Sequence, residues 1–230
     1  MTRKTPLLYG MILLLAACTN APESDKAATS DAKEVTAHSA DESWQVNTRE
    51  SKVEWIGTKV TGYHTGEVPV KSGEIFVKDG AVTGGKFVMD LANLTVSGPK
   101  DVSPSSNAKL LGHLKSADFF EVEKHPEATF ELTGLKPFEG AVQDTADPRQ
   151  ETIGKYKVEH PTHTVSGNLT IKNITKNIEF PARITVSGNT AEAIAKFNID
   201  RQQWNITYPG KPDDLIRKDI HLGIAIRAVK

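Results

Sequence analysis

Seven histidines and one cysteine are the side chains in this sequence that are best suited to bind a metal or act as nucleophiles. Two of the histidines, His160 and His163, form an H-P-T-H motif, and imidazole pairs of this kind bind zinc or copper. Positions three apart on a strand point to opposite faces, and Pro161 disrupts any helix that would align the two rings. We therefore expect no metal site.

The motifs that organise catalysis are also missing from the sequence. Ser166 is not part of a G-x-S-x-G motif, and no G-x-x-x-x-G-K-[ST] phosphate loop is present. Two acidic pairs, Asp118 with Glu121 and Asp213 with Asp214, fall in loop-like, solvated segments that do not favour acid–base catalysis. The sequence predicts a protein that is not an enzyme and has no cofactor.

The overall charge and the cysteine count exclude further classes. The chain has 230 residues, with 28 Lys and Arg against 29 Asp and Glu, a net charge of -1. This balance offers no basic surface for nucleic acid, so we expect no nucleic-acid partner. A single cysteine forbids an intrachain disulfide and a four-cysteine zinc site, so the fold must depend on a hydrophobic core.

The N-terminus has the pattern of an export signal. Arg3 and Lys4 precede an apolar run, Leu7 to Leu15, that is too short to span a bilayer as a helix. The run ends in L-A-A-C, which resembles the lipobox of bacterial lipoproteins and implies that Cys18 is acylated after removal of residues 1–17. The resemblance implies a membrane contact through the lipid anchor at the cell envelope, and Thr19, rather than Asp, favours the outer membrane facing the periplasm.

The next segment, residues 18–41, is rich in Ala, Ser, Thr, Asp and Glu and contains almost no large apolar side chain. Such a segment cannot bury enough surface to offset the entropy of ordering it. We expect a disordered tether, followed by one folded domain over residues 42–230.

The folded domain alternates apolar and polar residues at period two, with turn residues between the runs. One pair of runs, Val165 to Ile171 and Ile178 to Val186, predicts a hairpin around residues 173–176. Only residues 105–120 break the alternation, and they predict a short amphipathic helix with Ser105 or Ser106 as its N-cap. About eight antiparallel strands must hide their apolar face by closing on themselves or by pairing with a second sheet.

Several ordered motifs resemble the YceI-like family. They are G-H-L-K-S-A-D-F-F at 112–120, P-E-A-T-F at 126–130, V-S-G-N-L-T-I-K-N-I-T-K at 165–176 and F-N-I-D-R-Q-Q-W-N-I at 197–206. The resemblance implies an all-β, lipocalin-like antiparallel barrel of about eight strands, whose interior can hold a polyisoprenoid, quinone, fatty amide or other lipid-like chain. Residues 56–66 lack the early His of many members, and the 140–160 segment is longer than usual.

Strand parity then gives the side chains that point into the barrel, with two phenylalanines of the helix segment closing one end. These candidate ligand-binding residues are Val53, Trp55, Phe87, Met89, Leu91, Phe119, Phe120, Phe130, Leu169, Ile171, Phe197, Ile199, Trp204, Leu222 and Ile224. An eight-stranded barrel is either filled by its side chains or wide enough for one slender ligand. The sequence leaves open which of the two applies.

Three cationic side chains are candidates for contact with a phosphate or carboxylate head group: Lys109, His113 and Arg201. The favoured function is binding and carriage of an apolar lipid-like molecule. The alternatives are a filled-barrel interaction module that presents loops such as 140–160 to a protein partner, and an enzyme that uses His113 at the barrel mouth. Association into a homodimer is left open.

Overall fold

The computed structural model describes residues 20–35, 42–99, 102–140 and 156–230. Within these ranges the chain forms twelve strands, one α-helix and one 3-10 helix. The strands are β1 (Ala28–Asp31), β2 (Glu42–Val46), β3 (Lys52–Lys59), β4 (Gly62–Val68), β5 (Val70–Lys78), β6 (Ala81–Asp90), β7 (Glu127–Pro137), β8 (His163–Ile171), β9 (Ile174–Ser187), β10 (Thr190–Asp200), β11 (Gly210–Lys211) and β12 (Asp214–Val229). The helices are α1 (Pro104–Lys115) and η1 (Arg201–Trp204).

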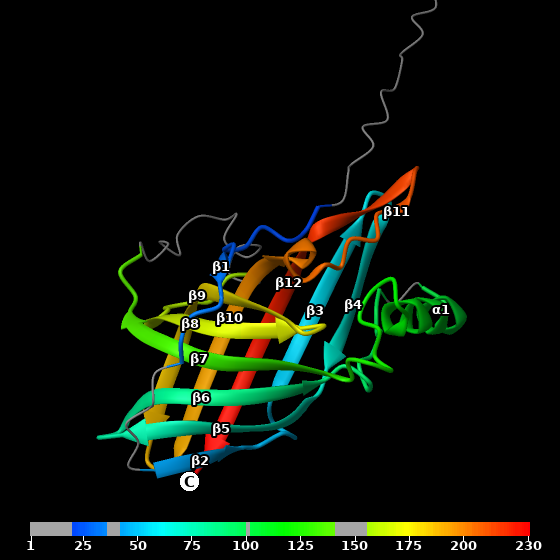
Figure 1. The fold of residues 1–230 in the computed structure, drawn as a ribbon. Coiled ribbons are helices and arrows are strands. Elements are labelled where there is room, and N and C mark those ends of the chain that lie inside the picture. The colour runs from blue at the N-terminus through cyan, green and yellow to red at the C-terminus, as the bar shows by residue number, and fades with distance from the viewer. Residues whose placement is uncertain (1–19, 36–41, 100–101, 141–155) are drawn as a thin grey trace, which may run out of the picture.

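Eight strands close into an antiparallel barrel (Figure 1). Their order around the ring is β9, β8, β7, β6, β5, β2, β12 and β10, and β10 pairs again with β9. The predicted all-β barrel of about eight strands with one short helix is confirmed. Closure gives each of these strands a partner on both sides, which protects edges that would otherwise pair with other chains.

β12, the longest described strand, pairs with two different strands on one of its sides. β2 pairs with its end at Ala228, whereas β3 pairs with it between Ile216 and Ala225, and β4 lies beyond β3. The β3–β4 hairpin therefore extends the wall past the end of the eight-stranded ring (Figure 1).

The outer edge of β4 is covered by the segment that follows β6. The Thr95 N–H donates to the Glu67 carbonyl and the Ser97 N–H to the Thr65 carbonyl, both at 2.8 Å. A Cβ at Gly66 would lie 1.8 Å from the Thr95 carbonyl oxygen, so this close approach requires glycine.

The β8–β9 hairpin is confirmed where the alternation predicts it. Its turn places Lys172 and Asn173 at φ values of 50° and 60°, the left-handed conformation of a type I′ turn. Asn tolerates this conformation better than most residues, which suits Asn173 to the turn.

The predicted helix is present as α1, but its N-cap is different. The Ser103 side chain accepts a hydrogen bond from the Ser106 N–H, and Pro104 begins the helix, so the prediction of Ser105 or Ser106 as the cap is wrong. Proline favours the first helical position because its missing N–H is not needed there. The helix turns Leu114 into the core and packs Leu110 against it.

Residues 20–35 do not form the predicted disordered tether, and that prediction is wrong for them. β10 leaves β9 after the Ala195–Ala182 pair, and the N-terminal wall segment, residues 25–31, fills the gap. The Ala27 N–H donates to the Asn198 carbonyl at 2.9 Å, and the Asn198 N–H donates to the Asp25 carbonyl at 2.8 Å. Main-chain pairing, together with the burial of Ala27 in the core, orders this segment.

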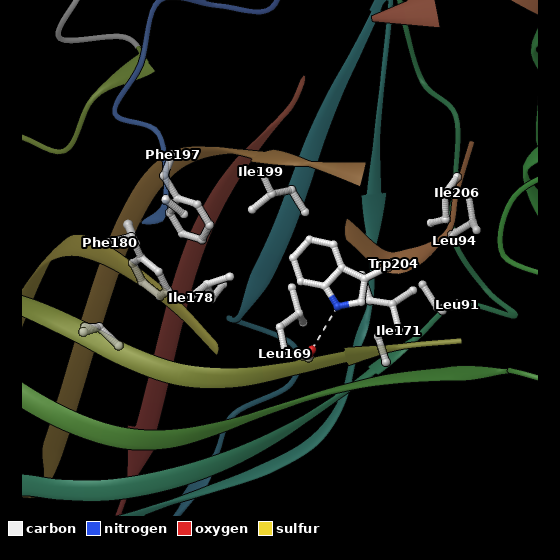
Figure 2. Packing of buried hydrophobic residues seen from close by; sticks show 14 of the residues in the cluster. Leu91, Leu94, Leu169, Ile171, Ile178, Phe180, Phe197, Ile199, Trp204 and Ile206 are labelled. Carbon is white, nitrogen blue, oxygen red and sulfur yellow. Dashed lines mark hydrogen bonds between the residues drawn. The ribbon is translucent and has the colours of Figure 1, made fainter. Parts of the chain in front are cut away.

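Inside the barrel the inward side chains form one main core (Figure 2). The rings of Phe180 and Phe197 stack with centroids 4.0 Å apart. Trp204, the last residue of η1, is fully buried. Successive strand residues alternate between inner and outer faces, so the period-two pattern builds this core directly.

Candidate functional site

The core contains a cavity of about 390 Å³, here called the main cavity. Apolar side chains make most of its wall, and they come from β3, β4, β6, β7, β8, β10, β12, α1, η1 and the segments that follow β6, α1 and η1. Its volume lies within the range of ligand pockets in proteins, about 300–1,000 Å³. The barrel is therefore not filled by its own side chains at this end.

A second cavity of about 150 Å³, here called the inner cavity, lies next to the main cavity and is lined mainly by β6, β7, β8, β9, β10 and β12. Four apolar residues line both cavities: Val53, Met89, Leu169 and Leu222. Along β12 the lining runs from Ile216 to Ala228, which at ~3.3 Å per residue is about 40 Å of strand. An occupant of both cavities would be long and narrow.

All fifteen candidate ligand-binding residues line one or both cavities, and their contact with a ligand stays a prediction. Besides the four shared ones, the main cavity is lined by Trp55, Leu91, Phe119, Phe120, Ile171, Ile199 and Trp204. The inner cavity is lined by Phe87, Phe130, Phe197 and Ile224. Eleven of the fifteen lie on strands, where parity turns them inward, whereas Leu91, Phe119, Phe120 and Trp204 lie outside the strands.

Some lining residues were missed by the parity argument. Leu110 and Leu114 come from α1, and Tyr208 comes from the segment after η1. The spacing of the two leucines by one helical turn was the available signal, because it gives the helix one apolar face. Nothing in the alternation identifies Tyr208.

Trp204 ties η1 to the barrel wall. Its indole N–H donates to the Leu169 carbonyl at 3.0 Å, and the side chain has no exposed surface (Figure 2). A buried indole N–H needs such a partner, because an unpaired one would cost the desolvation of a polar group. Trp204 is therefore a rigid part of the main-cavity wall.

Arg201 lines the main cavity, but its guanidinium is used by the main chain. It donates to the carbonyls of Ile206, Tyr208 (2.8 Å), Arg217 (3.2 Å) and Ile216 (3.4 Å). Burial lowers the pKa of Arg201, and the nearby Asp200 opposes this. Arg201 therefore connects η1 to β12 and to the segment between them. These hydrogen bonds leave few N–H groups of the guanidinium for the predicted head-group contact.

The other two head-group candidates lie on α1 with different exposure. His113 lines the main cavity, its Nε2 lies 2.9 Å from Asp118 Oδ2, and its ring meets those of Phe119 and Tyr208 edge-on at centroid distances of 5.0 and 4.7 Å. Lys109 is exposed and does not line the cavity. The structure does not bring the three cationic candidates together.

The polar side chains of the cavity gather at the β3–β4 end. Lys59 forms an ion pair with Asp214, which also accepts from the Thr61 N–H at 3.1 Å, and exposed Lys211 marks where the lining reaches the surface. Burial lowers the pKa of His64, which faces this end, although a hydrogen bond with the Gly98 backbone opposes the shift. Burial thus favours the neutral form of the His64 imidazole over its protonated form.

No group of three or more metal-binding side chains occurs within the described ranges. His160 adopts a φ of 50° in the loop before β8, and His163 begins that strand. Among the described helices, none combines the length and apolarity needed to cross a bilayer. Cys18 and the predicted signal peptide lie outside the described residues.

A closed eight-stranded antiparallel barrel around an apolar cavity is a lipocalin-like architecture. The family description "YceI-like domain" matches residues 44–228. The chain belongs to the YceI-like family.

Two curated relatives carry the description UPF0312 protein. The one from Azotobacter vinelandii is 36% identical over 84 residues, covering 36% of this chain and 33% of the relative. The one from Pectobacterium atrosepticum is 27% identical over 147 residues, covering 61% of this chain and 63% of the relative. The chain thus spans less than two thirds of the length of either relative.

Two solved structures share the fold. BcnA of Burkholderia cenocepacia superposes with a TM-score of 0.59 at 16% identity, covering 80% of this chain and 99% of BcnA. A polyisoprenoid binding domain from Saccharophagus degradans, implicated in plant cell wall breakdown, superposes with a TM-score of 0.55 at 12% identity, covering 81% and 97%. At these identities the likeness establishes the fold alone.

Proposed function

We propose that this protein binds one elongated, apolar, lipid-like molecule of the polyisoprenoid, quinone or fatty amide type inside the barrel and carries or sequesters it without chemical change. The observation that carries the proposal is the pair of adjacent cavities, which share four apolar lining residues. Removing apolar surface from water contributes about 25 cal/mol per Å², so a chain lying along this interior gains affinity without a charged contact. The structural neighbour described as a polyisoprenoid binding domain supports the same ligand class.

The proposal favours binding over the two alternatives. A filled barrel is the premise of the interaction module, and cavities of about 390 and 150 Å³ argue against that premise. His113 lines the main cavity beside Asp118 and two aromatic rings, and none of the catalytic motifs sought in the sequence accompanies it.

Mass spectrometry tests the proposal. Protein purified without detergent from its own cells should release, on solvent extraction, an apolar species at about one molecule per chain. Emptied protein should rebind a long polyisoprenol with a stoichiometry of one. Absence of any extractable species, together with failure to rebind probes of this kind, would contradict the proposal.

We also propose that Cys18 is acylated and that the protein is anchored at the cell envelope, on the periplasmic side of the outer membrane. The L-A-A-C motif and the apolar run before it support this. Metabolic labelling with a radioactive fatty acid should mark the wild-type protein and leave Cys18→Ser unlabelled. Labelling that persists in Cys18→Ser would refute acylation at this position.

A further inference from the structure

One end of the barrel has an unusual surface, here called the tip, formed by residues 57–64 and 208–218. Among the described residues only three large apolar side chains are exposed, and two of them, Tyr63 (45%) and Leu215 (46%), are on the tip. The third is Val229 (38%), at the far end of β12.

Tyr63 and Leu215 share the outer face of the tip. Lys59 and Ile216 are register partners that both line the main cavity, so Leu215, one position along, points to the opposite face. Tyr63 precedes His64, which lines the main cavity, and Tyr63 itself is 45% exposed and lines neither cavity. One strand separates Tyr63 from Leu215, which places them roughly 10 Å apart across the sheet.

The tip has more cations than carboxylates, with Lys59, Lys211, Arg217 and Lys218 against Asp213 and Asp214. Two of these cations form ion pairs, Lys59 with Asp214 and Lys218 with Asp200, and Lys211 is exposed where the cavity lining reaches the surface. Apolar side chains beside cations are the combination that binds the surface of an anionic bilayer.

The main cavity reaches the surface at this same end, since Lys59, Gly210 and Lys211 belong to its lining. The first described residues lie near this end. The Asn198 side-chain amide donates to the Pro22 carbonyl at 2.9 Å, and Lys26 lies 3.3 Å from Asp219, just beyond the tip.

From these observations we infer that the tip docks onto the surface of an anionic lipid bilayer, with Tyr63 and Leu215 entering the headgroup region and the mouth of the main cavity facing the lipid. This surface is separate from the proposed ligand site, because neither side chain lines a cavity. An acyl anchor at Cys18 would leave only Thr19 before the described chain, so the tip would already be held close to the bilayer.

Vesicle flotation tests the inference. The full chain carrying Cys18→Ser, so that no acyl chain contributes, is mixed with vesicles of phosphatidylethanolamine and phosphatidylglycerol. We expect it to float, to float less with phosphatidylcholine vesicles, and to lose about tenfold in apparent affinity in Tyr63→Ser/Leu215→Ser. Val229→Ser is the matched control and should bind like the parent protein.

A label provides a second readout that does not depend on affinity. Cys18 is the only cysteine, so in the Cys18→Ser background an environment-sensitive fluorophore can be attached at Tyr63→Cys or at Val229→Cys. Anionic vesicles should shift the emission of the first label to the blue and leave the second unchanged.

Three outcomes would overturn the inference: no flotation of the parent, equal loss of binding in Val229→Ser, or equal spectral shifts at both labels. Binding of a long polyisoprenol is measured on the same proteins. Loss of that binding in the parent would refute the proposed function and leave the bilayer contact standing, so the two failures can be told apart.

Discussion

Gly57 offers a way to close the main cavity without damaging the barrel. It lies in β3 and lines the cavity, and a Cβ added there would meet the Trp55 ring at 3.6 Å and Ile220 Cδ1 at 3.7 Å, which are ordinary van der Waals distances. A leucine at this position would therefore extend into free space. We expect Gly57→Leu to leave the free energy of unfolding unchanged or to raise it by about 1 kcal/mol, because glycine weakens a strand interior.

The effect on ligand binding should be much larger. The four side-chain carbons of leucine would displace about three or four methylene groups of an apolar occupant. At ~0.8 kcal/mol for each buried methylene, this is about 2.4–3.2 kcal/mol, or roughly a 50- to 200-fold increase in Kd. The prediction thus separates ligand affinity from fold stability.

Fluorescence titration with a polyene fatty acid measures the affinity, and urea unfolding measures stability. The matched control is Gly223→Leu on the adjacent β12, where a Cβ would lie 3.6 Å from Glu54 Oε2 on the outer face, between two residues that line the cavities. The control should bind like wild type. Unchanged affinity in Gly57→Leu, with the fold intact, would refute the assignment of the main cavity as the ligand site.

Three further predictions concern stability. Trp204→Phe should lower the free energy of unfolding by about 1–3 kcal/mol in urea titrations, because it leaves the Leu169 carbonyl without its indole donor. Asn168→Ala should cost about 1–2 kcal/mol and speed proteolysis at the N-terminus, since the Asn168 side chain bonds both the N–H and the carbonyl of Lys33; an unchanged cleavage rate would argue against this anchoring. Burial, aided by Lys196, lowers the pKa of His221 to about 4, so its stabilising contribution is complete above about pH 6.5 and is lost as the pH falls through 4. We expect a loss of roughly 2–3 kcal/mol over this range that is absent in His221→Gln, as measured by thermal unfolding at several pH values.

The sequence was most informative where one physical rule decides the structure. Alternation along β3, β6, β8, β10 and β12 determines which side chains face inward, so residues such as Trp55, Phe87 and Leu222 could be assigned to the cavity wall in advance. Whether that wall encloses free space could not be predicted, because it depends on how rings such as Phe130 pack. That ring lies over Gly167, where an added Cβ would come within 2.1 Å of it.

Other features depend on contacts between distant segments. The N-terminal wall segment has the composition of a disordered chain, and it is ordered because the gap between β9 and β10 offers main-chain partners. Arg201 resembles a head-group ligand in sequence, and only the folded chain brings the carbonyls of Tyr208 and Arg217 to its guanidinium. A one-dimensional pattern contains neither kind of information.

Closure of the barrel depends on β12, a strand of sixteen residues that comes after all the other described strands in the sequence. β12 pairs with β10, β2, β3 and β11, so the ring stays open until Asp214–Val229 are available. Partners as distant as β2 also give the fold a high contact order, which slows folding. The ring of a nascent chain therefore cannot close until Asp214–Val229 have been synthesised, because only then do β10 and β2 gain the strand that lies between them.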